Sequence, residues 1–272
     1  MFLIDTHCHL DVAEFDVDRE PVYIQATQAG VRGMVVPAVD RVSFSAVCEL
    51  PLRYPGCVYG LGIHPLYVAA ACEQDLEALR ERLHEGGATA VGEIGLDFLV
   101  EGHDRERQEW FFIEQLKLAR EFDLPVILHL RRAQDAVLKH LRRFRVRGGF
   151  AHAFNGSWQQ AEAFIGLGFK LGFGGAMTYD RALRLRELAA RLPADAIVLE
   201  TDAPDIAPAW AVRQRNVPAN LARIAATLAT LRGTTVAAVA EMTTVNALEV
   251  IPGLSAALGD ELSEKTGEKP LR

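Results

Sequence analysis

Phe2-Leu3-Ile4-Asp5-Thr6-His7-Cys8-His9 is a short apolar run that ends in two histidines. Short apolar runs recur through the 272 residues, and longer stretches whose apolar residues repeat every three or four positions separate them. The short runs have the length of buried strands, and the longer stretches have the period of amphipathic helices. This alternation is typical of parallel strands that are connected by helices.

The sequence predicts eight strands. Their ranges are 2–6, 33–37, 58–62, 89–93, 125–130, 149–152, 169–172 and 197–200. Eight strand-helix units fit one (β/α)8 TIM barrel, an α/β fold, whereas a doubly wound sheet would need a GxGxxG that does not follow the first strand. We assign 1–258 to a single barrel domain with extra C-terminal helices, and 259–272 to a charged, frayed tail.

Two features of the helical stretches are notable. Gly30 and Gly168 lie where a helix would stop at a left-handed residue, because glycine has no Cβ to penalise that conformation. Pro51 lies inside the helical segment 43–53. Its missing N–H and its ring are expected to end or kink that helix early.

Composition limits the kinds of function. The formal net charge of −7 argues against a surface that grips duplex DNA along its length, so an anionic substrate would be attracted locally. The four cysteines form no CxxC pair, which predicts reduced thiols rather than disulfides or a zinc knuckle. Neither a signal peptide nor a membrane span is evident. We expect a cytoplasmic protein that contacts no membrane and is by default a monomer.

Residues that can bind metal ions lie at or just past the C-terminal ends of the predicted strands. They are His7, His9, His64, Glu93, His129, His152 and Asp202. In a barrel these strand ends converge on one mouth. Any one of these histidines alone is more often an ordinary core or surface residue. Their shared position is what predicts a metal centre.

The residue types suggest separate roles. The period of a strand points His7 and His9 to one side and Cys8 to the other, so Cys8 is expected to be a buried thiol rather than a nucleophile. Glu93 ends the fourth predicted strand, and its two carboxylate oxygens can bridge two cations. Asp202 follows the eighth, where it can hold a metal and orient or deprotonate a water.

Six motifs occur in the order seen in TatD-like deoxyribonucleases. They are DTHCHLD (5–11), GIHP (62–65), GEIGLD (92–97), PVILHLRRA (125–133), AHAFNGS (151–157) and ETDAPD (200–205). The sequence resembles this family to about Leu254. The resemblance implies a hydrolase with two divalent ions, Mg²⁺, Mn²⁺ or Zn²⁺. It also implies DNA as substrate, with 3′–5′ exonuclease action on single-stranded or frayed ends.

The resemblance also implies roles for individual residues. One ion would be held by His7, His9, Glu93 and Asp202, and the other by Glu93, His129 and His152. Glu93 and Asp202 would thus be the catalytic residues. His64 and Arg131 would contact the substrate, which suits a phosphate because a guanidinium matches phosphate oxygens bidentately. Four imidazoles favour zinc or manganese over magnesium.

Several positions are less clearly placed. Leu130, Ala153 and Asn155 depart from the residues common in relatives, so pocket contacts are expected to differ there. Arg213 and Arg215 lie in a stretch that loosely resembles a substrate-contacting segment of relatives. The arginines at 142–147 are interpreted as a solvated face at the far end of the barrel. The glycines at 172–175 are a weak candidate for a phosphate cradle.

Alternative functions use the same metals. An amidohydrolase or lactonase would polarise a carbonyl instead of a phosphoryl group, and an esterase could act on aminoacyl-RNA. Glu93 stands where many binuclear amidohydrolases have a carboxylated lysine, which favours the nuclease. A non-catalytic metal-binding protein is disfavoured because all six ligand positions are filled.

Overall fold

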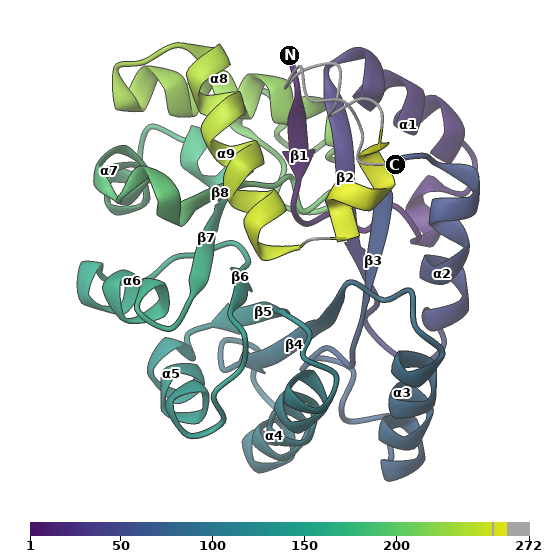
Figure 1. Ribbon diagram of the computed structural model, residues 1–272. Helices are drawn as coiled ribbons and strands as arrows, with labels where there is room; N and C mark the ends of the chain where they lie inside the picture. Colours follow the sequence, from purple (N-terminus) through teal and green to yellow (C-terminus); the bar gives the residue numbers. More distant parts are fainter. Residues whose placement is uncertain (252, 260–272) are drawn as a thin grey trace.

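The computed structural model describes residues 1–251 and 253–259, and the prediction of a (β/α)8 barrel is confirmed. Eight parallel strands pair in sequence order, with helices around them (Figure 1). The strands are β1 (Leu3–Asp5), β2 (Val31–Pro37), β3 (Cys57–Leu61), β4 (Ala90–Asp97), β5 (Val126–Arg131), β6 (Gly149–Ala151), β7 (Phe169–Phe173) and β8 (Ile197–Leu199). The predicted tail lies outside the described residues apart from Gly259.

An α-helix follows each strand. The labelled helices are α1 (Arg19–Gln28), α2 (Phe44–Arg53), α3 (Glu73–Glu85), α4 (Arg105–Glu121), α5 (Gln134–Arg143), α6 (Trp158–Ile165), α7 (Leu183–Arg191), α8 (Leu221–Arg232) and α9 (Val236–Val250). Helix α9 comes after α8, and the described residues 253–259 are also helical. Among the described residues, no helix is both long and apolar enough to cross a membrane. Gly30 and Gly168 have φ of +96° and +85°, as expected for helix stops.

Two apolar cores hold the barrel together. The larger core lies between the outward faces of the strands and the surrounding helices. The smaller core fills the inside of the barrel, where Ile4, Ile127 and Val198 from separate strands pack against Val250 and Ile251 at the end of α9. This helix crosses the N-terminal end of the strands (Figure 1). The bottom of the barrel is therefore closed, and the opposite end is left for the site.

The ends of β1 and β8 are joined by polar groups, although 196 residues separate them in the sequence. The Thr6 N–H donates to the Leu199 carbonyl at 3.0 Å. Asp5 accepts two hydrogen bonds from Thr201, one from its N–H at 2.9 Å and one from its hydroxyl at 2.5 Å. Burial raises the pKa of Asp5 to about 7, and the bonds from Thr201 limit the rise. Asp5 therefore fastens the barrel where its first and last strands meet.

Two local predictions need correction. The predicted fourth strand ended at Glu93, but β4 continues because its pairing with β5 shifts register between Val91 and Ile94 and then resumes as far as Asp97. Glu93 therefore lies within β4. Pro51 was expected to end or kink its helix early, yet α2 continues to Arg53. The loss of the Pro51 N–H bond to the Val47 carbonyl therefore does not end the helix, which continues for two more residues.

Replacing Asp5 with alanine is expected to lower the free energy of unfolding by about 2–4 kcal/mol, since two buried donors of Thr201 lose their acceptor. Urea unfolding followed by circular dichroism measures the change. Glu81→Ala, at an exposed acid on α3, serves as the control and should stay within about 0.5 kcal/mol of the wild type. Equal stability of the two variants would contradict the role given to Asp5.

Candidate functional site

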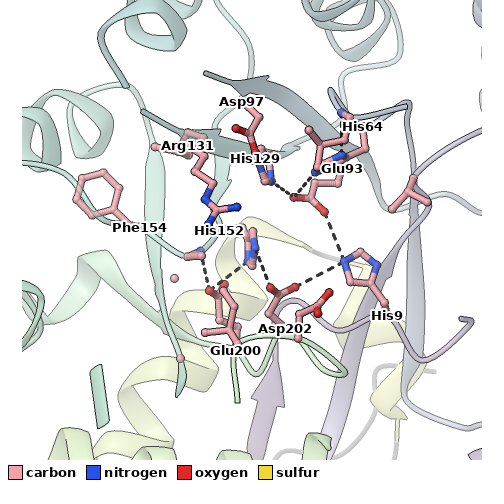
Figure 2. A pocket seen from close by; sticks show the side chains of 18 of the residues that line it. His9, His64, Glu93, Asp97, His129, Arg131, His152, Phe154, Glu200 and Asp202 are labelled. Atoms are coloured by element: carbon pink, nitrogen blue, oxygen red, sulfur yellow. Dashed lines mark hydrogen bonds and ion pairs between the residues drawn. The ribbon is translucent and has the colours of Figure 1, made fainter. Parts of the chain in front are cut away.

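The predicted metal-binding residues meet at the mouth of the barrel, beside a cavity of about 1370 Å³. Six of them line this cavity, namely His9, His64, Glu93, His129, His152 and Asp202. His7 lies beneath them and is fully buried. Figure 2 shows the labelled side chains of the cluster turned toward one another. Barrel closure thus brings together side chains that are nearly two hundred positions apart in the sequence.

A first group of atoms surrounds one point next to β1. His7 Nε2 lies 3.2 Å from His9 Nε2 and 3.1 Å from Glu93 Oε2. Asp202 Oδ1 lies 3.6 Å from each of the two Nε2 atoms. Ligand atoms that bind one ion at about 2.1 Å are roughly 3.0–3.4 Å apart. His7, His9 and Asp202 form one group of atoms that could hold an ion, and Glu93 Oε2 lies 3.1 and 3.5 Å from the two histidine nitrogens of that group.

The charges of this group are coupled, and a proton on His9 balances the nearby acids. Burial opposes that proton, but the hydrogen bond to Glu93 and the charges of Glu93 and Asp202 raise the pKa of His9 to about 9. A bound cation would take the place of this proton.

Burial and the neighbouring His152 hold the pKa of His7 well below its ordinary value, so its imidazole is neutral. Burial opposes ionisation of Glu93, but the surrounding imidazoles, including His129 at 2.8 Å, outweigh it and keep the pKa of Glu93 well below the usual range. Neutral imidazoles and ionised carboxylates are the metal-binding forms of these side chains.

A second group of atoms lies around the other oxygen of Glu93. Glu93 Oε1 lies 2.8 Å from His129 Nδ1 and 3.6 Å from His64 Nε2. His152 is less close to this group, since its ring centroid lies 6.4 Å from that of His129 and 3.7 Å from that of His7. The structure thus gathers Glu93 and His129 tightly, and places His152 nearer the first group, stacked on His7 and 3.6 Å from Asp202.

His64 lies close enough to be mistaken for a ligand of this second group. Its Nδ1 accepts a hydrogen bond from the Leu66 N–H at 3.2 Å. Burial and the neighbouring His129 lower its pKa to about 3, so the ring is neutral. A neutral imidazole whose Nδ1 accepts carries its proton on Nε2. His64 therefore presents a hydrogen-bond donor to the mouth.

Two buried carboxylates behind the site were not assigned from the sequence. Asp97 Oδ2 lies 3.1 Å from His129 Nε2, and Glu200 Oε1 lies 3.2 Å from His152 Nδ1. A carboxylate on one imidazole nitrogen fixes the tautomer and leaves the other nitrogen to bind metal. The signal was in the sequence, because Asp97 lies four residues after Glu93 on the same strand face.

The loop that carries Asp202 is held in an unusual conformation. Asp202 has a φ of +55°, and its N–H donates to the His7 carbonyl at 2.8 Å. The buried Asn216 side chain donates to the carbonyls of Thr201 and Asp205 at 2.8 and 2.9 Å. Non-glycine residues in this region cost on the order of 1–3 kcal/mol and cluster at functional sites. The two hydrogen bonds from Asn216 hold this loop in place, a role that was not assigned to Asn216 from the sequence.

Arg131 is in the mouth, whereas Arg213 and Arg215 are not. Arg131 ends β5, and its guanidinium points toward His152 (Figure 2). Arg215 instead pairs with Asp18 at 2.5 Å and does not line the cavity, and neither does Arg213. The loose resemblance at these two positions therefore did not identify mouth residues.

The remaining candidates have structural explanations. A Cβ on Gly172 would lie 2.1 Å from Glu200, so this glycine makes room for a buried carboxylate. Cys8 is buried in the core, as expected. The arginines at 142–147 lie between the end of α5 and the start of β6, at the end of the barrel opposite the mouth. Ala153 has a φ of +43° and donates its N–H to Glu200 at 2.6 Å.

Comparison with known proteins gives the family. A model described as "TatD related DNase" matches residues 4–252. The chain belongs to the TatD family. It is 44% identical over 232 residues to "Uncharacterized metal-dependent hydrolase YjjV" of Escherichia coli K12, covering 84% of this chain and 90% of that protein. The crystal structure of YjjV has a TM-score of 0.89 at 41% identity, covering 92% of this chain and 98% of that one.

Other TatD relatives have more specific names. The chain is 34% identical over 239 residues to "3'-5' ssDNA/RNA exonuclease TatD" of Klebsiella pneumoniae, which covers 85% of this chain and 90% of that protein. Membership of the TatD family and the clustered donors agree that this protein is a metal-dependent hydrolase.

Asp97→Asn is expected to weaken Mn²⁺ binding by about 10–100-fold, because an amide nitrogen cannot accept the proton of His129 Nε2. The asparagine oxygen can still accept from the Leu99 N–H, which Asp97 does at 2.9 Å. Isothermal titration calorimetry measures the affinity, with Asp104→Asn at the start of α4 as the control. Unchanged affinity in Asp97→Asn would show that Asp97 only shapes the following turn.

Proposed function

We propose that this protein is a phosphodiesterase that uses two divalent cations, Mg²⁺, Mn²⁺ or Zn²⁺, and removes nucleotides from the 3′ end of single-stranded or frayed DNA. The supporting observation is the position of Glu93, whose two oxygens face two separate groups of donors. One carboxylate between two cations is typical of two-metal phosphoryl transfer. Relatives named for exonuclease action on ssDNA and RNA support the substrate class.

Some residues of the site would bind the ions, and others would bind the substrate. His7, His9 and Asp202 would hold one ion, His129 and His152 the other, and Glu93 both. When bound, the two ions would offset charge on the phosphoryl group and lower the pKa of a water. Asp202 would orient this water and accept its proton, since its carboxylate lies at the mouth within 3.6 Å of both His9 and His152.

Two donors at the mouth suit the non-bridging oxygens of a phosphate. Arg131 is exposed and its guanidinium points into the cavity (Figure 2). His64 presents its Nε2 proton next to Glu93. Both are placed to hold the phosphate while the water is aligned. Local charge of this kind explains how a protein of net charge −7 attracts an anionic strand.

Chelator-treated protein should be inactive on 5′-labelled single-stranded DNA and recover when Mg²⁺, Mn²⁺ or Zn²⁺ is added. Glu93→Ala and Asp202→Ala should each lower turnover at least about 100-fold, because the ion bridge or the proton acceptor is lost. Arg143→Ala, at an exposed arginine far from the mouth, is the matched control and should retain activity.

The same assay separates the alternatives. RNA, aminoacyl-RNA and a lactone are tested in parallel with DNA. Cleavage that persists in chelator, or equal loss in all three variants, would contradict the proposed site. Turnover of the aminoacyl ester or the lactone without any nucleic-acid cleavage would replace the phosphodiesterase with another hydrolase.

A further inference from the structure

Charge divides the lining of the mouth into two halves. The arginine half contains Arg131, Arg132 and Arg184. The acidic half contains Asp11, Glu14, Asp40 and Asp205. The metal-binding groups lie between them, and Figure 2 shows Arg131 on one side of this cluster and His9 on the other. A DNA strand that enters the mouth would therefore have positive side chains on one side of its reacting phosphate and negative side chains on the other.

The order of strands in the barrel explains the division. Arg131 and Arg132 follow from β5, and Arg184 belongs to α7, which follows β7. The acids come after β1, β2 and β8, which are neighbours because β8 meets β1. Arg131 and Arg132 thus lie across the ring of strands from the acids, and Arg184 reaches toward their side, where it donates to Asn155 after β6. The division is a property of the whole mouth.

Nearby charges offset the two halves only in part, since Arg19 and His9 act on Asp11 in the acidic half. Arg19 pairs with Asp16 and Arg215 with Asp18, and neither arginine lines the cavity. Arg184 donates to the neutral side chain of Asn155 at 2.9 Å, so its charge is retained. Asn155 is one of the positions that depart from the common family pattern. Here it orients an arginine toward the mouth.

The acidic half also offers an aromatic surface. Tyr67 lines the cavity with 45% of its surface exposed, and its ring centroid lies 6.0 Å from that of His64. Burial raises the pKa of Tyr67, and the carboxylates of Asp40, Glu14, Asp11 and Asp205 raise it further, so all four acids act on this ring. An aromatic ring stacks on a nucleobase, whereas clustered carboxylates repel a phosphate.

Resting on the proposed function, we propose that the mouth selects a strand terminus by charge. The anionic body of the strand lies against the arginine half, and the terminal nucleoside lies against Tyr67 in the acidic half. A 3′-hydroxyl end fits there. A 3′-phosphate, or a strand that continues, is repelled. The acidic half is thus what restricts cleavage to the last nucleotide.

Paired oligonucleotides that differ only at the 3′ end test this proposal. The wild type should cleave a 5′-labelled 3′-hydroxyl oligonucleotide with a kcat/KM about tenfold or more above that of its 3′-phosphate form. Glu14→Gln/Asp205→Asn removes two exposed carboxylates and keeps the backbone hydrogen bond from the Asp205 N–H to the Asp202 carbonyl, and it should reduce this ratio at least about threefold. The control Glu77→Gln/Glu81→Gln removes equal charge from α3 and should keep the wild-type ratio.

Three outcomes would overturn the proposal. Equal cleavage of both ends by the wild type contradicts it and leaves the proposed function intact. An unchanged ratio in Glu14→Gln/Asp205→Asn, or the same fall in the α3 control, assigns the selection elsewhere. Absence of cleavage of either oligonucleotide by the metal-loaded wild type removes the proposed function and this inference together.

The arginine half has its own measurement. Arg132→Ala should raise KM for a 3′-hydroxyl 10-mer about threefold or more and leave KM for a dinucleotide unchanged, since only the longer strand has phosphates that reach beyond the reacting one. An equal rise for both lengths would place Arg132 at the reacting phosphate and contradict its assignment to the strand body.

Discussion

The junction between β1 and β8 is the constraint on which the site depends. Asp5 holds Thr201 there, and the Asp202 N–H donates to the His7 carbonyl one residue further along. His7, His9 and Asp202 therefore belong to a single rigid corner, although they come from opposite ends of the chain. A barrel that did not close at this point would leave three donors without a common centre.

Glu93 extends that corner across the mouth. Its carboxylate is buried, faces imidazoles on both sides and is kept ionised by them. The carboxylates of Asp97 and Glu200 stand behind two of these imidazoles and fix their orientation. The lining of the mouth around this cluster is also charged, with arginines in one half and acidic residues in the other. The proposed positions of the ions and of the substrate thus depend on the same ring of strands.

The fold and the convergence of the candidate ligand residues were predictable because they depend on local signals. Apolar runs mark strands, and parallel strands in a barrel end at one mouth, so His129 and His152 could be placed without coordinates. The extension of β4 past Glu93 was not predictable, because it depends on a register shift against β5. The tautomer of His64 likewise depends on the Leu66 N–H. The two charged halves of the mouth could not be predicted, because they form only when the folded barrel brings together loops from distant strands.

In the proposed function, the Glu93 carboxylate lies between two cations. Crystals soaked in Mn²⁺ and measured for anomalous scattering test it most directly. We expect two anomalous peaks roughly 3.5–4 Å apart, with Glu93 between them. One peak should lie next to His7 and His9, and the other next to His129. A single peak, or two peaks of which Glu93 touches neither, would contradict it.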